Sequence, residues 1–213
     1  MKHCLCKPRA ADTEINTDAV VNGRLLLEAA TPVTNTSNKQ LQQVLDSMRN
    51  GTVASIAKKD SFIMQFGSVL LRKLGRSRAH DVPQRMRQLA RLKIQLKVAS
   101  KSSKSLMMYI SGANFDTVID AVNKLCGLTI DDIGRHWFTK PSLALKLGHS
   151  LVKCAQVKKG MAIREDKVEM RREAESYMDL HTSEYSDIVS STALAKLKQK
   201  KYNKPLALPL TND

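Results

Sequence analysis

Lysine and arginine side chains are concentrated between residues 72 and 104 of this 213-residue chain. That stretch contains eleven of them and a single acidic residue, Asp81, and so supplies most of the formal net charge of +15. A basic block of this kind is typical of a phosphate-binding surface, because each neutralised phosphate releases counterions and because arginine can bind a phosphate or a guanine edge through two hydrogen bonds. The candidate DNA-binding residues of this block are Arg72, Arg76, Arg78, Arg85, Arg87, Arg91, Lys93 and Lys97.

A second group of cations follows residue 140. Lys146, His149 and Lys153 are three and four residues apart and fall on the flank of a predicted helix opposite its apolar face, while Gly148 leaves room for a close neighbour. This flank is either a second phosphate-contacting edge or the solvated side of an ordinary amphipathic helix, and the pattern fits both equally well. A third group near the C-terminus adds two further candidates, Lys198 and Lys201.

The charge pattern is also compatible with less specific roles. Basic residues often only solvate helix surfaces, and the cations from residue 85 to residue 97 do not form one narrow stripe, which argues against a dedicated recognition helix. Acidic protein or membrane surfaces are the alternative partners of a basic block. Aromatic residues make up only 4% of the chain, which argues against binding through stacked bases. The segment from Arg164 to Asp187 is acidic, and we expect it to stay away from DNA.

Cysteine and histidine residues indicate little further chemistry. His3, Cys4 and Cys6 could contribute to a zinc site, but a structural zinc site needs four ligands and no second pair follows. Cys126 and Cys154 lie on apolar faces of predicted helices, so we expect both to be buried in the core. No nucleotide-binding, zinc-protease or serine-hydrolase motif occurs, and no pair of carboxylates stands out as an acid and base. We therefore expect a protein that is not an enzyme and that has no cofactor, no metal site and no small-molecule substrate.

The elements that would position these side chains are helical. Helix formers dominate, apolar residues recur at helical spacing, and Gly and Pro punctuate the segments, so the sequence predicts an all-α fold, a bundle of about six to seven helices. Gly75 should end the second helix, and Asn114 and Thr139 are available to cap the fourth and the fifth. The predicted helices span residues 39–48, 61–74, 83–99, 115–126, 141–158, 164–180 and 183–201.

One segment fits a helix less well. Residues 91–98 alternate strictly between polar and apolar side chains, which is the period of a strand. We still predict a helix, because residues 84–90 are strong helix formers and no second strand is available to pair with this one.

The chain as a whole divides into three parts. Residues 1–37 are predicted to be a flexible arm, residues 38–204 a helical domain, and residues 205–213 a linker or tail containing Pro205 and Pro209. The helical domain could also consist of two subdomains, 38–112 and 113–204. No apolar run approaches the length of about 20 residues that a membrane span needs, and the N-terminus lacks the apolar stretch of a signal peptide, so we expect an intracellular, reducing location.

Several stretches resemble a known family. They are Met86 to Leu92, Lys140 to Leu151, Lys153 to Ala155, Val189 to Ser191, Asn203 to Pro205 and Leu208 to Thr211. This pattern is similar to a family of animal proteins related to the tyrosine recombinases of Crypton-type mobile elements, and the resemblance covers about residues 39–211. In that family the matching region is helical and precedes the catalytic domain.

The resemblance implies a counterpart of the core-binding domain, the helical N-terminal region that clamps duplex DNA opposite the catalytic domain. The Arg, Lys, His and Tyr residues of the recombinase reaction belong to the catalytic domain, so we expect no strand cleavage by this polypeptide alone. A non-catalytic, nuclear, double-stranded DNA-binding module of mobile-element origin is the leading hypothesis, with homo-oligomers possible. The alternative is a helical interaction or scaffold protein whose basic surface meets acidic protein partners.

Overall fold

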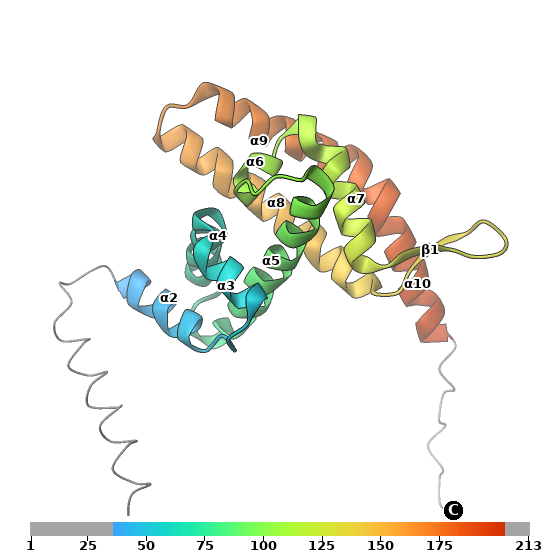
Figure 1. The fold of residues 1–213 in the computed structure, drawn as a ribbon, viewed down its shortest axis with the longest axis horizontal. Coiled ribbons are helices and arrows are strands. Elements are labelled where there is room, and N and C mark those ends of the chain that lie inside the picture. Colours follow the sequence, from blue (N-terminus) through green and yellow to red (C-terminus); the bar gives the residue numbers. More distant parts are fainter. Residues whose placement is uncertain (1–35, 203–213) are drawn as a thin grey trace, which may run out of the picture. The chain divides into compact units, whose positions relative to one another are not determined.

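The computed structural model describes residues 36–202, apart from the side chains of residues 36–39 and of Arg76. Contacts divide the chain between Lys39 and Gln40 into two units, and the second unit carries the core and all the elements after the first helix. The described chain is all-α, as predicted, with one small two-stranded sheet (Figure 1). The predicted arm up to residue 35 and the predicted tail lie outside the described residues, whereas Thr36 and Ser37, also assigned to the arm, are helical.

The elements agree with most of the predicted ranges. Two short helices, α3 and α6, were not predicted, and α8 continues six residues beyond the predicted end at residue 158. The elements are α2 (Thr36–Asp46), α3 (Thr52–Lys59), α4 (Ser61–Leu74), η1 (Arg76–Arg78), α5 (Asp81–Ser100), α6 (Leu106–Tyr109), η2 (Gly112–Asn114), α7 (Phe115–Cys126), β1 (Leu128–Ile130), β2 (His136–Phe138), α8 (Pro141–Arg164), α9 (Val168–Leu180), η3 (His181–Ser190) and α10 (Ser191–Tyr202).

Helix ends follow local sequence only in part. Gly75 ends α4 with a φ of 67°, as predicted. Asn114 occupies the N-cap position of α7, but its side chain does not cap that helix and donates instead to the carbonyl of Met108 at 3.0 Å. Thr139 does not cap α8 either, because its hydroxyl donates to the carbonyl of Gly127 at 3.1 Å. The two predicted side-chain caps are therefore wrong, since both side chains have tertiary partners.

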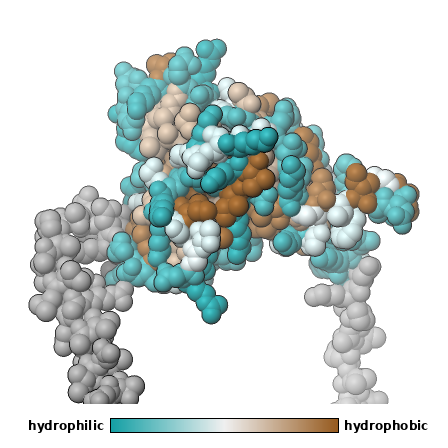
Figure 2. All heavy atoms as spheres, in the orientation of Figure 1, coloured by the Kyte–Doolittle hydropathy of each residue, from teal (hydrophilic) through white to brown (hydrophobic). Residues whose placement is uncertain are grey.

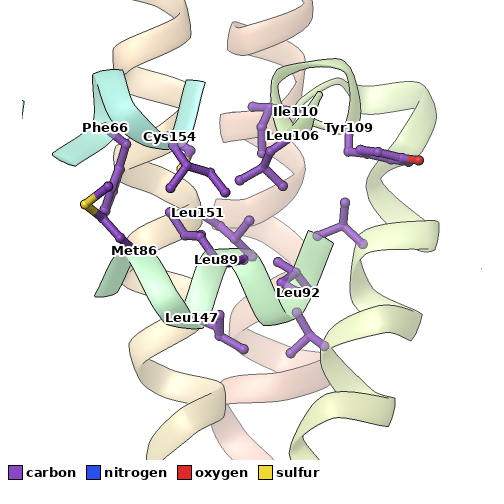
Figure 3. Packing of buried hydrophobic residues seen from close by; sticks show 14 of the residues in the cluster. Phe66, Met86, Leu89, Leu92, Leu106, Tyr109, Ile110, Leu147, Leu151 and Cys154 are labelled. Carbon is purple, nitrogen blue, oxygen red and sulfur yellow. The ribbon is translucent and has the colours of Figure 1, made fainter. Parts of the chain in front are cut away.

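A single hydrophobic cluster runs through the unit and takes in residues from both sides of residue 112. Figure 3 shows side chains from different helices pointing into it, including Phe66 from α4, Leu106 from α6 and Leu151 from α8. Helices α4 and α5 approach closely where Gly67 meets Met86, since a Cβ on Gly67 would lie 2.6 Å from the sulfur of Met86. Burial of many such apolar side chains provides most of the stabilisation.

The alternating segment 91–98 is helical, as predicted, and forms the last turns of α5. Leu92 and Leu96 are four residues apart and fully buried, together with Leu89 of the preceding turn. Val98 belongs to the apolar half of the alternation and is 71% exposed. The helical period, rather than the alternation, therefore decides which side chains enter the core.

The sheet is an antiparallel hairpin of β1 and β2, which was not predicted, although the β-branched and aromatic residues on either side of a Gly-containing turn are a signal for one. Asp131 closes its turn by accepting from the N–H groups of Ile133 (3.0 Å) and Arg135 (2.7 Å). Ile130 and Ile133 are 64% and 76% exposed, and Figure 2 shows hydrophobic residues on this hairpin at the edge of the visible face.

The two predicted C-terminal helices are joined. Helices α9 and α10 are connected without a break by η3, a ten-residue π-helical segment in which the N–H of Ser191 bonds to the carbonyl of Ser186, five residues earlier. Tyr185 of this segment is buried and donates to the carbonyl of Ala144 in α8 at 2.8 Å. Gly148 permits that contact, because a Cβ there would lie 2.6 Å from the ring of Tyr185. The close neighbour predicted for Gly148 is therefore Tyr185.

Candidate nucleic-acid interface

Two surface depressions bring cations together from separate segments of the chain. The first, which we call the α5 depression, has a volume of about 440 Å³ and is lined by Ser47, His80, Pro83, Gln84, Arg87 and Arg91. The second, which we call the α8 depression, has a volume of about 480 Å³, and its polar lining comes from Gln84, Gln88, Thr139, Lys140, Ser142, Lys146 and Lys200. Gln84 lines both, so the two depressions adjoin across α5. Within the described part of the chain, no aspartate or glutamate lines either of them.

The exposed side of α5 accounts for the α5 depression. At 3.6 residues per turn, Gln84, Arg87 and Arg91 fall on one side of the helix, away from the buried side that contains Leu89 and Leu92. Arg91 is exposed, and among the described residues it has no hydrogen-bond or ion-pair partner. It can therefore bind an anion without first giving up a contact within the protein.

Arg87 has a structural contact as well as a surface position. Its Nη2 donates to the carbonyl of Arg49, after α2, at 3.0 Å, and its side chain is half-buried. A guanidinium has five N–H donors, so this single bond leaves the others free for a ligand. Arg87 thus connects the first part of the unit to α5 while it lines the depression.

Lys93, predicted as a phosphate contact, lies on another side of α5. Its ammonium is 2.5 Å from Oδ2 of Asp60, its side chain is only 19% exposed, and the Asp60 side chain is completely buried. Lys93 is six residues from Arg87, and this spacing carries it to a different face of the helix. We therefore correct its assignment: the Lys93 ammonium is engaged in a buried ion pair and is not part of the surface.

The acidic residue of the basic block neutralises part of it. Asp81 accepts from Nη2 of Arg78 at 2.9 Å and lies 3.4 Å from Nε2 of His80. The hydrogen bond from Arg78 lowers the pKa of the Asp81 carboxyl below its ordinary value, although the site is exposed. Arg78 is therefore less available to a phosphate than Arg91.

The remaining predicted cations of the block line neither depression. Arg72 is exposed in the last turn of α4, Lys97 is exposed near the end of α5, and Arg85 is half-buried. Arg76 belongs to η1, and its side chain is outside what the structure describes.

The predicted flank of α8 is present. Lys146 and His149 are exposed and Lys153 is half-buried, with its Nζ 3.4 Å from Oε1 of Gln156. Lys146, in the second turn, lines the α8 depression, whereas His149 and Lys153 continue along the same side of the helix beyond it.

The C-terminal cations have unequal positions on α10. Lys198 and Lys201 are exposed and line neither depression, whereas Lys200, which was not among the predicted site residues, lines the α8 depression. Lys196 is used structurally, because its Nζ lies 4.5 Å from the centre of the Trp137 ring on the hairpin. Such a cation–π contact fixes the hairpin against α10.

The prediction from sequence missed eight of the polar residues that line the depressions, among them Gln84, Gln88, Lys140 and Lys200. Gln84 and Gln88 could have been found from helical spacing, because Gln84 precedes Arg87 and Arg91 by three and seven residues. Lys140 and Lys200 come from segments sixty residues apart, and no local signal brings them together.

The acidic helix α9 uses its carboxylates in ion pairs with α8. Glu173 lies 2.6 Å from Nζ of Lys158, and Glu175 lies 2.9 Å from Nζ of Lys159. The side-chain hydrogen bonds from Lys159 and Arg171 lower the pKa of Glu175. Lys158 is buried and also donates to the carbonyls of Met107 (3.2 Å) and Ile110 (2.6 Å), so it is a structural cation.

The two cysteines of the predicted helices are buried, as predicted. Cys126 and Cys154 are fully buried, and burial raises the pKa of Cys126 to about 12 and also raises the pKa of Cys154. Between residues 36 and 202, no group of three or more His, Cys, Asp or Glu side chains is arranged to hold a metal ion. The candidate zinc ligands His3, Cys4 and Cys6 lie outside the described residues.

Comparison with protein-family models, with curated proteins and with solved structures finds no match. Among the described helices, none combines the length and the apolar character that crossing a bilayer requires.

Proposed function

We propose that this protein is a non-catalytic module that binds duplex DNA through its phosphates, with a nuclear location and an origin in a mobile-element tyrosine recombinase. The DNA contacts assigned to it are Arg87, Arg91, Lys140, Lys146 and Lys200, with His149 and Lys153 as secondary contacts along α8.

The observation that carries this proposal is the pair of adjoining depressions. Cations from α5, α8 and α10 line these two depressions, which share Gln84, and no described aspartate or glutamate is among the lining residues. Like charges gathered in this way repel one another unless an anion lies between them, so the surface suits a polyanion. A duplex carries phosphates along its whole length and so offers more than one anion to the two depressions, which favours DNA over a single small anion.

The first experiment is fluorescence anisotropy of a labelled 30-base-pair duplex with the full chain, repeated over a range of salt concentrations. A plot of the logarithm of the binding constant against the logarithm of the salt concentration should have a steep negative slope. Each phosphate that the protein neutralises contributes about −0.9 to this slope, so several contacts make it steep. Absence of binding even at low salt would contradict the proposal.

Paired charge-reversal variants locate the surface. Arg91→Glu with Lys146→Glu should weaken binding at least tenfold and make the slope shallower by about 2, as expected for the loss of two phosphate contacts. Lys104→Glu with Arg164→Glu changes the net charge equally at two exposed residues that line neither depression. Equal weakening by both pairs would show that only net charge matters and that the assigned surface is wrong.

Competition separates DNA from the alternative class of partner. Unlabelled duplex should displace the labelled duplex better than an acidic polypeptide of equal charge, because the duplex holds its phosphates in a fixed array whereas the polypeptide must be ordered on binding. The opposite order would favour the scaffold protein with acidic protein partners.

A further inference from the structure

The α8 depression differs from the rest of the basic surface because it is built around the start of a long helix. Pro141 is the first residue of α8, which runs for 24 residues, and the next residue, Ser142, lines the depression. The N–H groups in the first turn of a helix have no partner within that helix, and the positive end of the helix dipole lies there. No side-chain oxygen caps this end of α8. Pro141 has no N–H, and the N–H groups of Leu143 and Ala144 donate to the carbonyl of Lys140, so the N–H of Ser142 is the first-turn donor left without a partner among the described residues.

Three ammonium groups surround this helix end. Lys140 immediately precedes the helix, Lys146 lies in its second turn, and Lys200 approaches from α10. All three are exposed, and none has an ion-pair partner among the described residues. A helix N-terminus with several lysines is a good site for an anion, and phosphate is the anion that such sites commonly hold in proteins.

Gln88 supplies an independent observation on the α5 side of the depression. Its side chain lines the depression and is only 5% exposed, and its Oε1 is buried without a hydrogen-bond partner. A buried amide without a partner is costly, by about 1–3 kcal/mol, and native proteins seldom contain one without a reason. A side-chain amide has both donors and an acceptor, so a rotation about its last torsion lets it donate to an anion in the depression.

We propose that the α8 depression is a seat for a single phosphate group, held by the ammonium groups of Lys140, Lys146 and Lys200, by the N–H of Ser142 and by the side-chain amide of Gln88. The inference deepens the proposed function and rests on it for the source of the phosphate, which would be a phosphate of the bound DNA strand. The shared chemistry is that of a phosphate ester, and a free phosphate ester would satisfy the same groups.

The test is a titration of the full ¹⁵N-labelled chain with sodium phosphate, against sodium chloride at equal ionic strength, followed by NMR. Phosphate should cause saturable shifts of the Ser142 N–H and of the Gln88 side-chain amide, and chloride should not. Lys140→Ala with Lys146→Ala should weaken phosphate binding at least tenfold, whereas Lys104→Ala with Arg164→Ala should leave it unchanged. The assignment would be overturned if phosphate shifted neither the Ser142 N–H nor the Gln88 amide. It would also be overturned if Lys140→Ala with Lys146→Ala left the phosphate affinity unchanged.

A variant at Gln88 separates binding from folding. Gln88→Met keeps the size of the side chain and removes the amide that has no partner, so the melting temperature should stay the same or rise while phosphate affinity falls. Unchanged phosphate affinity in Gln88→Met would remove Gln88 from the seat and, with it, the observation that distinguishes this depression.

A further NMR titration identifies which phosphate of the DNA occupies the seat. It uses two 30-base-pair duplexes, one with 5′-phosphates and one with 5′-hydroxyl ends. Shifts at Ser142 and Gln88 with both duplexes assign a phosphate within the strand, and shifts with the phosphorylated duplex alone assign a strand end. DNA binding without shifts at these two residues would overturn the seat and leave the proposed function standing. Phosphate binding in the seat without DNA binding would retain the seat for a free phosphate ester and overturn the function.

Discussion

The ammonium of Lys93 lies 2.5 Å from Oδ2 of Asp60, across 33 residues of sequence, and this ion pair joins the start of α4 to the middle of α5. Asp60 is also the N-cap of α4, accepting from the N–H groups of Phe62 (2.9 Å) and Ile63 (3.2 Å). The same carboxylate accepts from the N–H of Leu106 at 3.0 Å, at the start of α6. One buried side chain therefore fixes three helices, with a cation taken from the basic block as its partner.

Removal of the Asp60 charge should be strongly destabilising. Asp60→Asn leaves the Lys93 ammonium without its carboxylate, and breaking a buried ion pair from one side costs about 3–5 kcal/mol. Urea unfolding followed by circular dichroism measures the change. Lys93→Met combined with Asp60→Asn should cost less than the sum of the two single variants; an additive result would mean that the two residues do not interact.

Acid should weaken the same contact. Burial by itself raises the pKa of Asp60, but the hydrogen bond from Lys93 and those from the N–H groups of Leu106 and Ile63 outweigh it, so the pKa lies below its ordinary value of 3.8. The stabilisation is therefore present above pH 3.8 and is lost as the pH falls through the lower pKa of the folded state. Asp60→Asn has no carboxyl group to protonate at this position. In this variant the free energy of unfolding, measured as a function of pH, should therefore no longer show the fall below pH 3.8 that Asp60 causes.

Two adjacent lysines of α8 should respond differently to the same substitution. Lys158→Met leaves the buried carbonyl of Ile110 without a donor, which costs about 1–3 kcal/mol. The carbonyl of Met107 loses Lys158 as well but keeps the N–H of Ile110 as a donor at 3.2 Å. Lys159→Met removes only a partly exposed pair with Glu175 and should cost less than about 1 kcal/mol. Chemical denaturation of both variants provides the comparison, and equal losses would show that the buried position of Lys158 is not what matters.

Two glycines of α8 provide another matched pair. Gly148→Ala places a methyl group 2.6 Å from the ring of Tyr185, and we expect a loss of about 1–3 kcal/mol because the packed interface must move apart. At Gly160 the nearest atom to an added Cβ is 3.7 Å away, so Gly160→Ala should raise the stability by about 0.5–1 kcal/mol through its better helix propensity. Thermal melting of the two variants should shift in opposite directions. A stabilising Gly148→Ala would contradict the close contact between α8 and the π-helical segment.

His181 should make stability depend on pH between about 4 and 6.5. Burial lowers the pKa of this histidine to about 4 from its ordinary value of 6.5, and its ring stacks on Tyr185 with 4.3 Å between the ring centres. Between these two pH values the unfolded chain takes up a proton that the folded chain does not, so the free energy of unfolding should fall as the pH falls from 6.5 towards 4.

Two histidine variants separate this effect from the titration of other groups. His181→Phe keeps an aromatic ring against Tyr185 and should flatten the pH dependence of stability in that range. His136→Gln changes an exposed histidine on the hairpin that does not contribute to the lowered pKa of His181, so this variant should keep the pH dependence. A pH dependence that persists in His181→Phe would assign it to another residue.

Local patterns in the sequence are sufficient to establish the class of fold and much of the helical arrangement. Apolar residues at helical spacing mark the buried sides of α4, α7 and α8, and the same spacing places Cys126 and Cys154 in the core and Lys146, His149 and Lys153 on one flank. These features depend on the period of a single helix, so they can be read from a single segment. The unpredicted hairpin, and the π-helical connection where two separate helices were expected, mark the limits of such patterns.

Which cations share a surface depends instead on how the helices pack. Lys93 and Arg91 are two residues apart in the basic block, yet the first enters a buried ion pair and the second lines the α5 depression. Lys140 and Lys200 meet at the start of α8 although sixty residues separate them. The difference has a physical reason. The helical period of the sequence determines on which face of its own helix a charged side chain lies. Which faces of different helices lie next to one another is determined by how the helices pack against the common core, and the sequence of a single segment does not contain that information.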